Sequence, residues 1–251
     1  MNHKTDVINW KQFIIKCKVE ESSNVYSFYL TPLKAGMVTL HKPGQYVPIR
    51  IYSNKSNEYF SGNFSISSAP NEDYYRIAVT STNYNQLENY LIAYAEEGFI
   101  VEVGDPMGNF VLRDNNHNKV FIADSLGQAP LLSMLETLDL KESLNEKIVW
   151  ISQLDNLKNH AFRTKINYIK DNCTALQTHL FFNSLENENA GSHVYEGTVD
   201  LTKIRDWELD LSADYYVCGS ALFTKRLQSF LDKQDIQTSQ LYVGNNTSSL
   251  N

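Results

Sequence analysis

The stretch GNFSISSAP, residues 62–70, places an aromatic side chain beside a hydroxyl. Its alternation predicts a strand with Phe64 on one face and Ser65 on the other. Phe64 can pack on a planar ring and Ser65 can donate a hydrogen bond, which is the chemistry that holds a flavin ring. Composition alone favours the alternative, in which Phe64 is part of an ordinary strand core.

Two further candidate sites lie at the ends of apolar runs. Gly127, in DSLGQAP, precedes a predicted helix, and a glycine there lets the backbone approach a ligand closely. Cys218 and Gly219 end the run DYYVCG. Taken alone these signals are weak, because one glycine is common before a helix and a cysteine at a strand end is usually core.

The elements that must position these residues fall into two groups. From Trp10 to about Leu112 the pattern is of short alternating strands, FVL at 110–112 included, with one helix at 86–96. This pattern predicts a small antiparallel β-barrel over residues 1–114.

The polar stretch RDNNHN, residues 113–118, marks the predicted boundary. Beyond it, continuous apolar runs alternate with helical segments, one of them expected at 157–169. Such runs are typical of strands buried on both faces, so we expect an α/β domain with a doubly wound parallel sheet over residues 115–251.

Composition excludes several classes of function. The formal net charge of −7, without a basic stripe, argues against a nucleic-acid partner. No run approaches the length of a membrane span, and the start MNHKTDVINW lacks an apolar signal region. Three widely spaced cysteines indicate a reducing compartment, and the six histidines lack metal-ligand spacing. We therefore expect a cytoplasmic protein without a metal; the sequence leaves the oligomeric state open.

The order of the motifs resembles the ferredoxin reductase-like superfamily with an FAD-binding FR-type barrel, and most closely the reductase part of flavohemoproteins. The resemblance covers nearly the whole chain. The segments that carry it follow one another in the family's order: KPGQYVPIRI, SISSAP, YYRIAV, GFIVEVGDPMGNFVL, ADSLGQAPLLSML, HAFRTKI, EGTVDL and YYVCGSALF.

The resemblance implies an oxidoreductase that passes electrons from NAD(P)H through FAD to a separate acceptor protein. Phe64 would then pack on the flavin, and Ser65 would hydrogen-bond near its reactive nitrogen. Gly127 would admit the diphosphate of NAD(P)H, and Cys218 and Gly219 would flank the nicotinamide. Ser65 and Cys218 are the candidate catalytic residues.

The chain also departs from the family pattern, chiefly where phosphates would bind. Gly62 stands where the flavin motif has an arginine, and Glu88 stands where a phosphate-binding turn has a serine. The alternative for Glu88 is an ordinary helix residue that is exposed to solvent. Ser125 and Ala129 replace a glycine and a threonine of the nicotinamide turn.

Two other functions therefore stay open. A diverged, non-catalytic member of the fold could act as a protein- or ligand-binding module. Alternatively, the chain could carry FMN or a loosely bound flavin, since FMN has no diphosphate. Arg50 and Arg76 are near in sequence and could replace the missing arginine.

Overall fold

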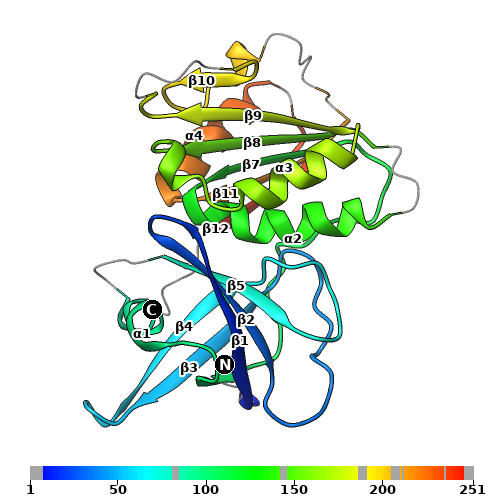
Figure 1. Ribbon diagram of the computed structural model, residues 1–251. Coiled ribbons are helices and arrows are strands. Elements are labelled where there is room, and N and C mark those ends of the chain that lie inside the picture. Colours follow the sequence, from blue (N-terminus) through cyan, green and yellow to red (C-terminus); the bar gives the residue numbers. More distant parts are fainter. Residues whose placement is uncertain are drawn as a thin grey trace, which may run out of the picture.

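The computed structural model describes residues 8–80, 85–141, 146–185, 191–204, 210, 212–234 and 236–245. The chain forms two lobes, a barrel built by the N-terminal part and a sheet covered by helices built by the C-terminal part (Figure 1). Strands of the first sheet lie within residues 11–80 and 100–103, and those of the second lie within residues 119–245.

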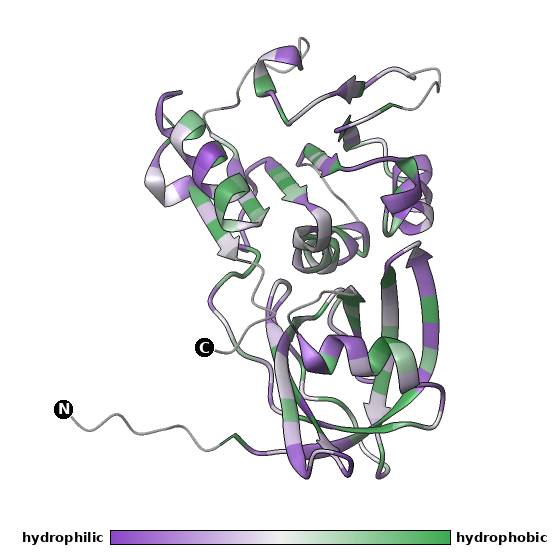
Figure 2. Cartoon of the chain, turned by 90° about the vertical axis from the view of Figure 1, so that its left-hand side faces the viewer, coloured by the Kyte–Doolittle hydropathy of each residue, from purple (hydrophilic) through white to green (hydrophobic). Residues whose placement is uncertain are grey.

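The first lobe is an antiparallel sheet of six strands in the order β4-β3-β6-β1-β2-β5. These strands are β1 (Lys11–Ser22), β2 (Val25–Pro32), β3 (Tyr46–Ser53), β4 (Glu58–Ser65), β5 (Tyr75–Thr80) and β6 (Ile100–Val103). Hydrophobic and hydrophilic residues alternate along the long strands (Figure 2), so that one face forms the core. An antiparallel bridge between Ile66 and Ile77 joins the two edge strands near their ends. The sheet therefore curls into the predicted barrel.

Helix α1 (Gln86–Tyr94) covers the barrel core with Leu87 and Leu91, which are each 1% exposed. The predicted strand at 110–112 is wrong. Instead, the N–H of Leu112 donates to the carbonyl of Pro43, and this loop carries the chain from the barrel to the second lobe.

The second lobe is a parallel sheet of six strands in the order β10-β9-β8-β7-β11-β12. The strands are β7 (Lys119–Asp124), β8 (Ile148–Leu154), β9 (Leu176–Phe182), β10 (Val194–Glu196), β11 (Asp214–Gly219) and β12 (Leu241–Asn245). The helices are α2 (Gln128–Asp139), α3 (Arg163–Asn172) and α4 (Ala221–Asp232), with short 3₁₀ turns η1 (Ser125–Gly127), η2 (Leu157–Asn159), η3 (Leu201–Lys203) and η4 (Thr238–Gln240). Helices α2 and α3 cover one face of this sheet and α4 covers the other.

The single helix predicted at 157–169 is wrong in its first half. The side chain of Asn156 caps the short turn η2, and Phe162 then adopts a left-handed conformation with φ of 61°. A non-glycine residue with this backbone conformation interrupts a helix, so α3 begins only at Arg163.

The two lobes meet along α2, which faces the barrel (Figure 1). Glu136 of α2 pairs with Arg76 of β5 at 2.8 Å and also accepts a hydrogen bond from the backbone N–H of Ala69. Ser133 donates to the carbonyl of Ser68 at 2.7 Å. Buried polar contacts of this kind fix how the lobes are placed relative to one another.

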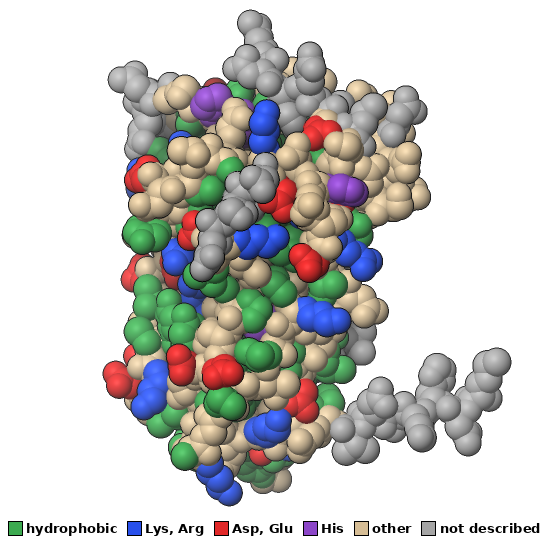
Figure 3. Space-filling model, turned by 90° about the vertical axis from the view of Figure 1, so that its right-hand side faces the viewer, with side chains coloured by type: hydrophobic (Ala, Val, Ile, Leu, Met, Phe, Trp, Pro, Cys, Tyr) green, Lys and Arg blue, Asp and Glu red, His purple; other side chains and the backbone are tan. Residues whose placement is uncertain are grey.

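Surface charges of both signs are mixed on the face shown in Figure 3. Within the part of the chain that the structure describes, no helix is both long and apolar enough to cross a bilayer. Nor do three or more His, Cys, Asp or Glu side chains gather as metal ligands among those residues.

Candidate functional site

Phe64 and Ser65 lie at the end of β4, where the sequence predicts the flavin contacts. Phe64 is 3% exposed and packs in the barrel core, whereas Ser65 is half-buried. A Cβ atom at Gly62 would lie 3.2 Å from Cε2 of Phe64 and 3.5 Å from Nδ2 of Asn85. The Phe64 ring thus lies over Gly62, near Asn85, the residue that caps α1.

The N-terminus of α1 is capped from within the chain. The Asn85 side-chain oxygen accepts hydrogen bonds from the N–H groups of Leu87, at 3.0 Å, and Glu88, at 3.1 Å. These amides are the groups that an N-terminal phosphate site would use. Glu88 itself is only 1% exposed, so the expectation that it is a solvated helix residue is wrong.

The two arginines that could replace the missing one are engaged elsewhere. Arg50 pairs with Glu102 at 2.7 Å, and its guanidinium lies over the rings of Trp10 and Tyr59. Arg76 is buried and pairs with Glu136 in the interface between the lobes.

These observations decide how well the chain fits the FAD that the resemblance implies. Asn85 occupies the amides that would hold a diphosphate, Glu88 adds a buried carboxyl group next to them, and Gly62 supplies no cation. The described residues therefore do not fit the diphosphate of FAD. Residues 81–84, directly before α1, and the tail from residue 246 lie outside the described residues.

At the turn from β7 into α2, the chain passes directly against β11. A Cβ atom at Gly127 would lie 2.1 Å from the carbonyl oxygen of Cys218 and 2.9 Å from Cα of Gly219. The structure thus brings together three of the predicted site residues, Gly127, Cys218 and Gly219. Gly127 is required there because backbone, rather than a movable side chain, occupies the space.

Cys218 lies in the core at 2% exposure. Burial, and secondarily the nearby Asp124 carboxylate, raises the pKa of its thiol to about 12. The thiol is therefore neutral at physiological pH. A neutral buried thiol packs against its neighbours and does not act as a thiolate nucleophile. The predicted catalytic role of Cys218 stays a prediction, as does that of Ser65 in the other lobe.

Asp124 holds the start of α4 against the end of β7. Its carboxylate accepts hydrogen bonds from the backbone N–H of Ser220, at 3.0 Å, and from the Ser220 hydroxyl, at 2.7 Å. Burial raises the pKa of Asp124, and the Ser220 hydrogen bonds oppose this shift. A carboxylate thus occupies the helix N-terminus that a ligand anion could otherwise use.

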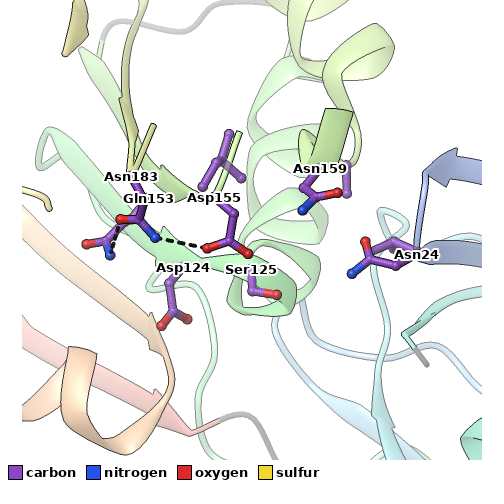
Figure 4. Close-up of a pocket in the computed structure, with 10 residues that line it drawn as sticks. Asn24, Asp124, Ser125, Gln153, Asp155, Asn159 and Asn183 are labelled. Carbon is purple, nitrogen blue, oxygen red and sulfur yellow. Dashed lines mark hydrogen bonds between the residues drawn. The ribbon is translucent and has the colours of Figure 1, made fainter. Parts of the chain in front are cut away.

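A pocket of about 130 Å³ opens at the carboxyl ends of β7, β8 and β9 (Figure 4). It is lined by residues from both lobes: Asn24, Val25, Asp124, Ser125, Gln153, Leu154, Asp155, Asn159, Ala161 and Asn183. Asn183 donates to Asp155 at 2.9 Å, and Gln153 donates to Asn183 at 3.4 Å. The Ser23 hydroxyl, at the tip of the β1–β2 hairpin, donates to Asn159 at 2.6 Å and ties the two walls together.

The chemistry of this pocket is that of carboxylates and carboxamides. None of the described residues that line it is a lysine or an arginine. Such groups bind hydroxyls and amides well and disfavour an additional phosphate. Its position, beyond the carboxyl ends of parallel strands, is where ligands bind in open α/β sheets.

Sequence reasoning missed Asn85, Asp124, Asp155 and Ser220. Asn85 had a readable signal, because asparagine directly before a predicted helix is a common N-cap. Asp124 and Ser220 could not be paired from sequence, since their contact depends on β7 and β11 being neighbours in the sheet.

Comparison with known proteins gives the same assignment as the fold. No family model matches the sequence. The chain is 29% identical over 226 residues to a flavohemoprotein of Bacillus subtilis, covering 89% of this chain and 56% of that protein. It is 27% identical over 249 residues to a flavohemoprotein of Oceanobacillus iheyensis, covering 96% and 60% respectively. The chain thus spans less than two thirds of the length of these relatives.

Solved structures share the architecture. The FAD/NAD-binding domain of a nitric oxide dioxygenase from Vibrio cholerae superposes with a TM-score of 0.83 at 22% identity, covering 94% of this chain and 98% of that one. The cytochrome b5 reductase domain of Ulva prolifera nitrate reductase gives 0.77 at 16% identity, covering 94% and 97%. The predicted fold class and the predicted resemblance to the ferredoxin reductase-like superfamily, through the reductase part of flavohemoproteins, are confirmed.

Proposed function

We propose that this chain is a flavin-dependent NAD(P)H oxidoreductase, which moves electrons from a nicotinamide cofactor through a flavin to a separate acceptor. The observation that carries the proposal is the joining of a reductase-type barrel to a parallel sheet whose carboxyl edge opens into a polar pocket. The relatives named flavohemoprotein, and the FAD/NAD-binding domain of similar fold, support the same activity.

The nicotinamide cofactor would bind at the carboxyl edge of the parallel sheet. There Gly127 and Gly219 keep the backbone close-packed, and the carboxamide N–H groups of Gln153 and Asn183 are donors that line the pocket beside the Asp155 carboxylate. Asp155 favours a hydroxyl over a phosphate at this position. We therefore propose NADH rather than NADPH as the preferred donor.

At the flavin, Ser65 is the residue proposed to act on the reacting atoms. Its hydroxyl is half-buried at the end of β4 and would donate a hydrogen bond to the ring near the reactive nitrogen. Phe64 would form part of the wall behind the ring rather than an open stacking face, because it is already buried. Cys218 and Gly219 would lie beside the nicotinamide.

The proposal is tested by anaerobic reduction of added flavin by NADH, followed through the loss of visible flavin absorbance. We expect Ser65→Ala to lower the rate of flavin reduction at saturating flavin by about tenfold or more. This is the effect expected when one hydrogen bond to the reacting ring is lost. Ser61→Ala, at an exposed position of the same strand, is the matched control and should retain the rate. If neither NADH nor NADPH reduces the flavin, the proposed activity is wrong, and the alternative of a non-catalytic binding module is favoured.

A further inference from the structure

The expected flavin site has two parts, one at the start of α1 for the phosphates and one at the end of β4 for the flavin ring. The chain keeps the expected residue types only in the part for the ring. The departures lie at the phosphate end, in Gly62, Asn85 and Glu88. The aromatic and the hydroxyl of β4, Phe64 and Ser65, are retained at the ring end. We infer that a flavin serves this chain as an exchangeable substrate whose affinity does not depend on its phosphate groups; this inference rests on the proposed function.

Binding a diphosphate at the start of α1 would bring no net gain of hydrogen bonds. The N–H groups of Leu87 and Glu88 already donate to Asn85 at 3.0 and 3.1 Å. A phosphate could reach them only by displacing this carboxamide, which would then need new partners. The exchange removes as many hydrogen bonds as it forms, so it adds little to affinity.

The start of α1 also carries a buried acidic residue. Glu88 is 1% exposed and lies in the first turn of α1. As a carboxylate it would repel a diphosphate, and as a neutral carboxyl it would offer no positive charge. A carboxylate at this position therefore disfavours FAD relative to a flavin without a diphosphate, and neither protonation state supplies a cation for the phosphates.

Among the described residues, Arg50, Arg76 and Lys18 are already paired with carboxylates. Arg50 and Arg76 each hold a carboxylate at 2.7–2.8 Å. Lys18 approaches α1 at its opposite end, where its ammonium group donates to the carbonyl of Ile92 and to Glu96. Turning any of them toward a phosphate would break an existing ion pair.

The reaction that follows is balanced without any additional reagent. One C–H bond of the dihydronicotinamide breaks, and its hydride forms an N–H bond on the flavin. A proton from water completes the reduced flavin, which leaves with both electrons, while the oxidised nicotinamide leaves separately. The separate acceptor of the proposed function would then be reduced by the released flavin.

The experiment compares the equilibrium dissociation constants of riboflavin, FMN and FAD for the intact chain, measured by equilibrium dialysis. We expect the three constants to agree within about tenfold, which corresponds to ~1.4 kcal/mol. FAD that binds about a hundredfold tighter than riboflavin, or that stays bound in stoichiometric amount through purification, would overturn the inference and leave the proposed function standing. Binding of none of the three would overturn both.

A second measurement restores the missing groups one at a time. Glu88→Ser and Gly62→Arg should each tighten FAD by about tenfold relative to riboflavin, because only FAD carries the diphosphate that the new residue can contact. Glu97→Ser and Ser61→Arg introduce the same residue types at exposed positions and should change neither constant. Saturable riboflavin binding by each variant also shows that the variant is folded. If restoring both groups together leaves FAD no tighter, the inference is wrong.

Discussion

Removing one partner of the buried ion pair between Arg76 and Glu136 should strongly destabilise the protein, because the other charge would stay buried without a counterion. Their side chains are 7% and 10% exposed, and the nitrogen and oxygen are 2.8 Å apart. Glu136 also accepts from the backbone N–H of Ala69 at 3.0 Å. Although burial opposes its charge, Arg76 has a raised pKa because of the Glu136 carboxylate.

Replacing Glu136 by alanine leaves the Arg76 charge buried and unpaired. Breaking a buried pair in this way typically costs about 3–5 kcal/mol, and the Ala69 N–H loses its acceptor as well. We therefore expect Glu136→Ala to lower the free energy of unfolding by about 3–5 kcal/mol. This is a large share of the roughly 5–15 kcal/mol that is usual for a folded domain.

Urea denaturation at equilibrium, followed by intrinsic fluorescence and circular dichroism, measures this loss. Arg76→Met combined with Glu136→Leu removes both charges, so the double variant should be more stable than Glu136→Ala. Glu97→Ala, at an exposed position, should change stability by less than about 0.5 kcal/mol. The reasoning is refuted if Glu136→Ala loses less than about 1 kcal/mol, or if the double variant is the less stable of the two.

Four other predictions follow from single contacts. Asn85→Ala should lower the free energy of unfolding by about 0.5–2 kcal/mol, because α1 loses its cap, as measured by urea denaturation. Gly127→Ala should destabilise by about 1–3 kcal/mol or more, since its Cβ would lie 2.1 Å from the carbonyl oxygen of Cys218. Burial lowers the pKa of His160 to about 4, so the unfolded chain binds more protons below pH 6.5 and stability falls as the pH is lowered. Between about pH 7 and 5 this loss should be about 2 kcal/mol, and His160→Leu should lack it. Finally, Asp155→Asn should narrow the difference between the dissociation constants of NADH and NADPH, measured by titration calorimetry.

Each of these four has an outcome that contradicts it. The predictions for Asn85→Ala and Gly127→Ala are wrong if these variants unfold at the same urea concentration as the unmodified chain. The His160 account fails if His160→Leu keeps the full dependence on pH. The account of Asp155 fails if NADPH already binds as tightly as NADH.

The two-lobe architecture was predictable because the two halves bury their strands differently. Barrel strands such as β1 and β4 bury one face and alternate where they do so, whereas β7 is buried on both faces and reads as the continuous run KVFIAD. The break before α3 was not predictable, because HAFR is compatible with a helix and only the left-handed Phe162 interrupts it.

The sequence predicted where Gly127, Cys218 and Gly219 lie along the chain, before a helix and at a strand end, whereas their roles in a site stay predictions. Gly127, Cys218 and Gly219 come together as the motif order implies. The burial of Glu88 depends on how α1 packs against the barrel, and helical spacing alone places it next to solvent as readily as in the core. His160 is another such case, because its position in HAFR does not distinguish a surface residue from a buried one, and the side chain is only 4% exposed.

The most direct test of the whole account is the steady-state oxidation of NADH by the intact chain with riboflavin or with FAD as the electron acceptor. The account predicts turnover with both flavins, with values of kcat/KM that agree within about tenfold. Turnover with FAD alone would contradict the exchangeable flavin, and no turnover with either would contradict the oxidoreductase itself.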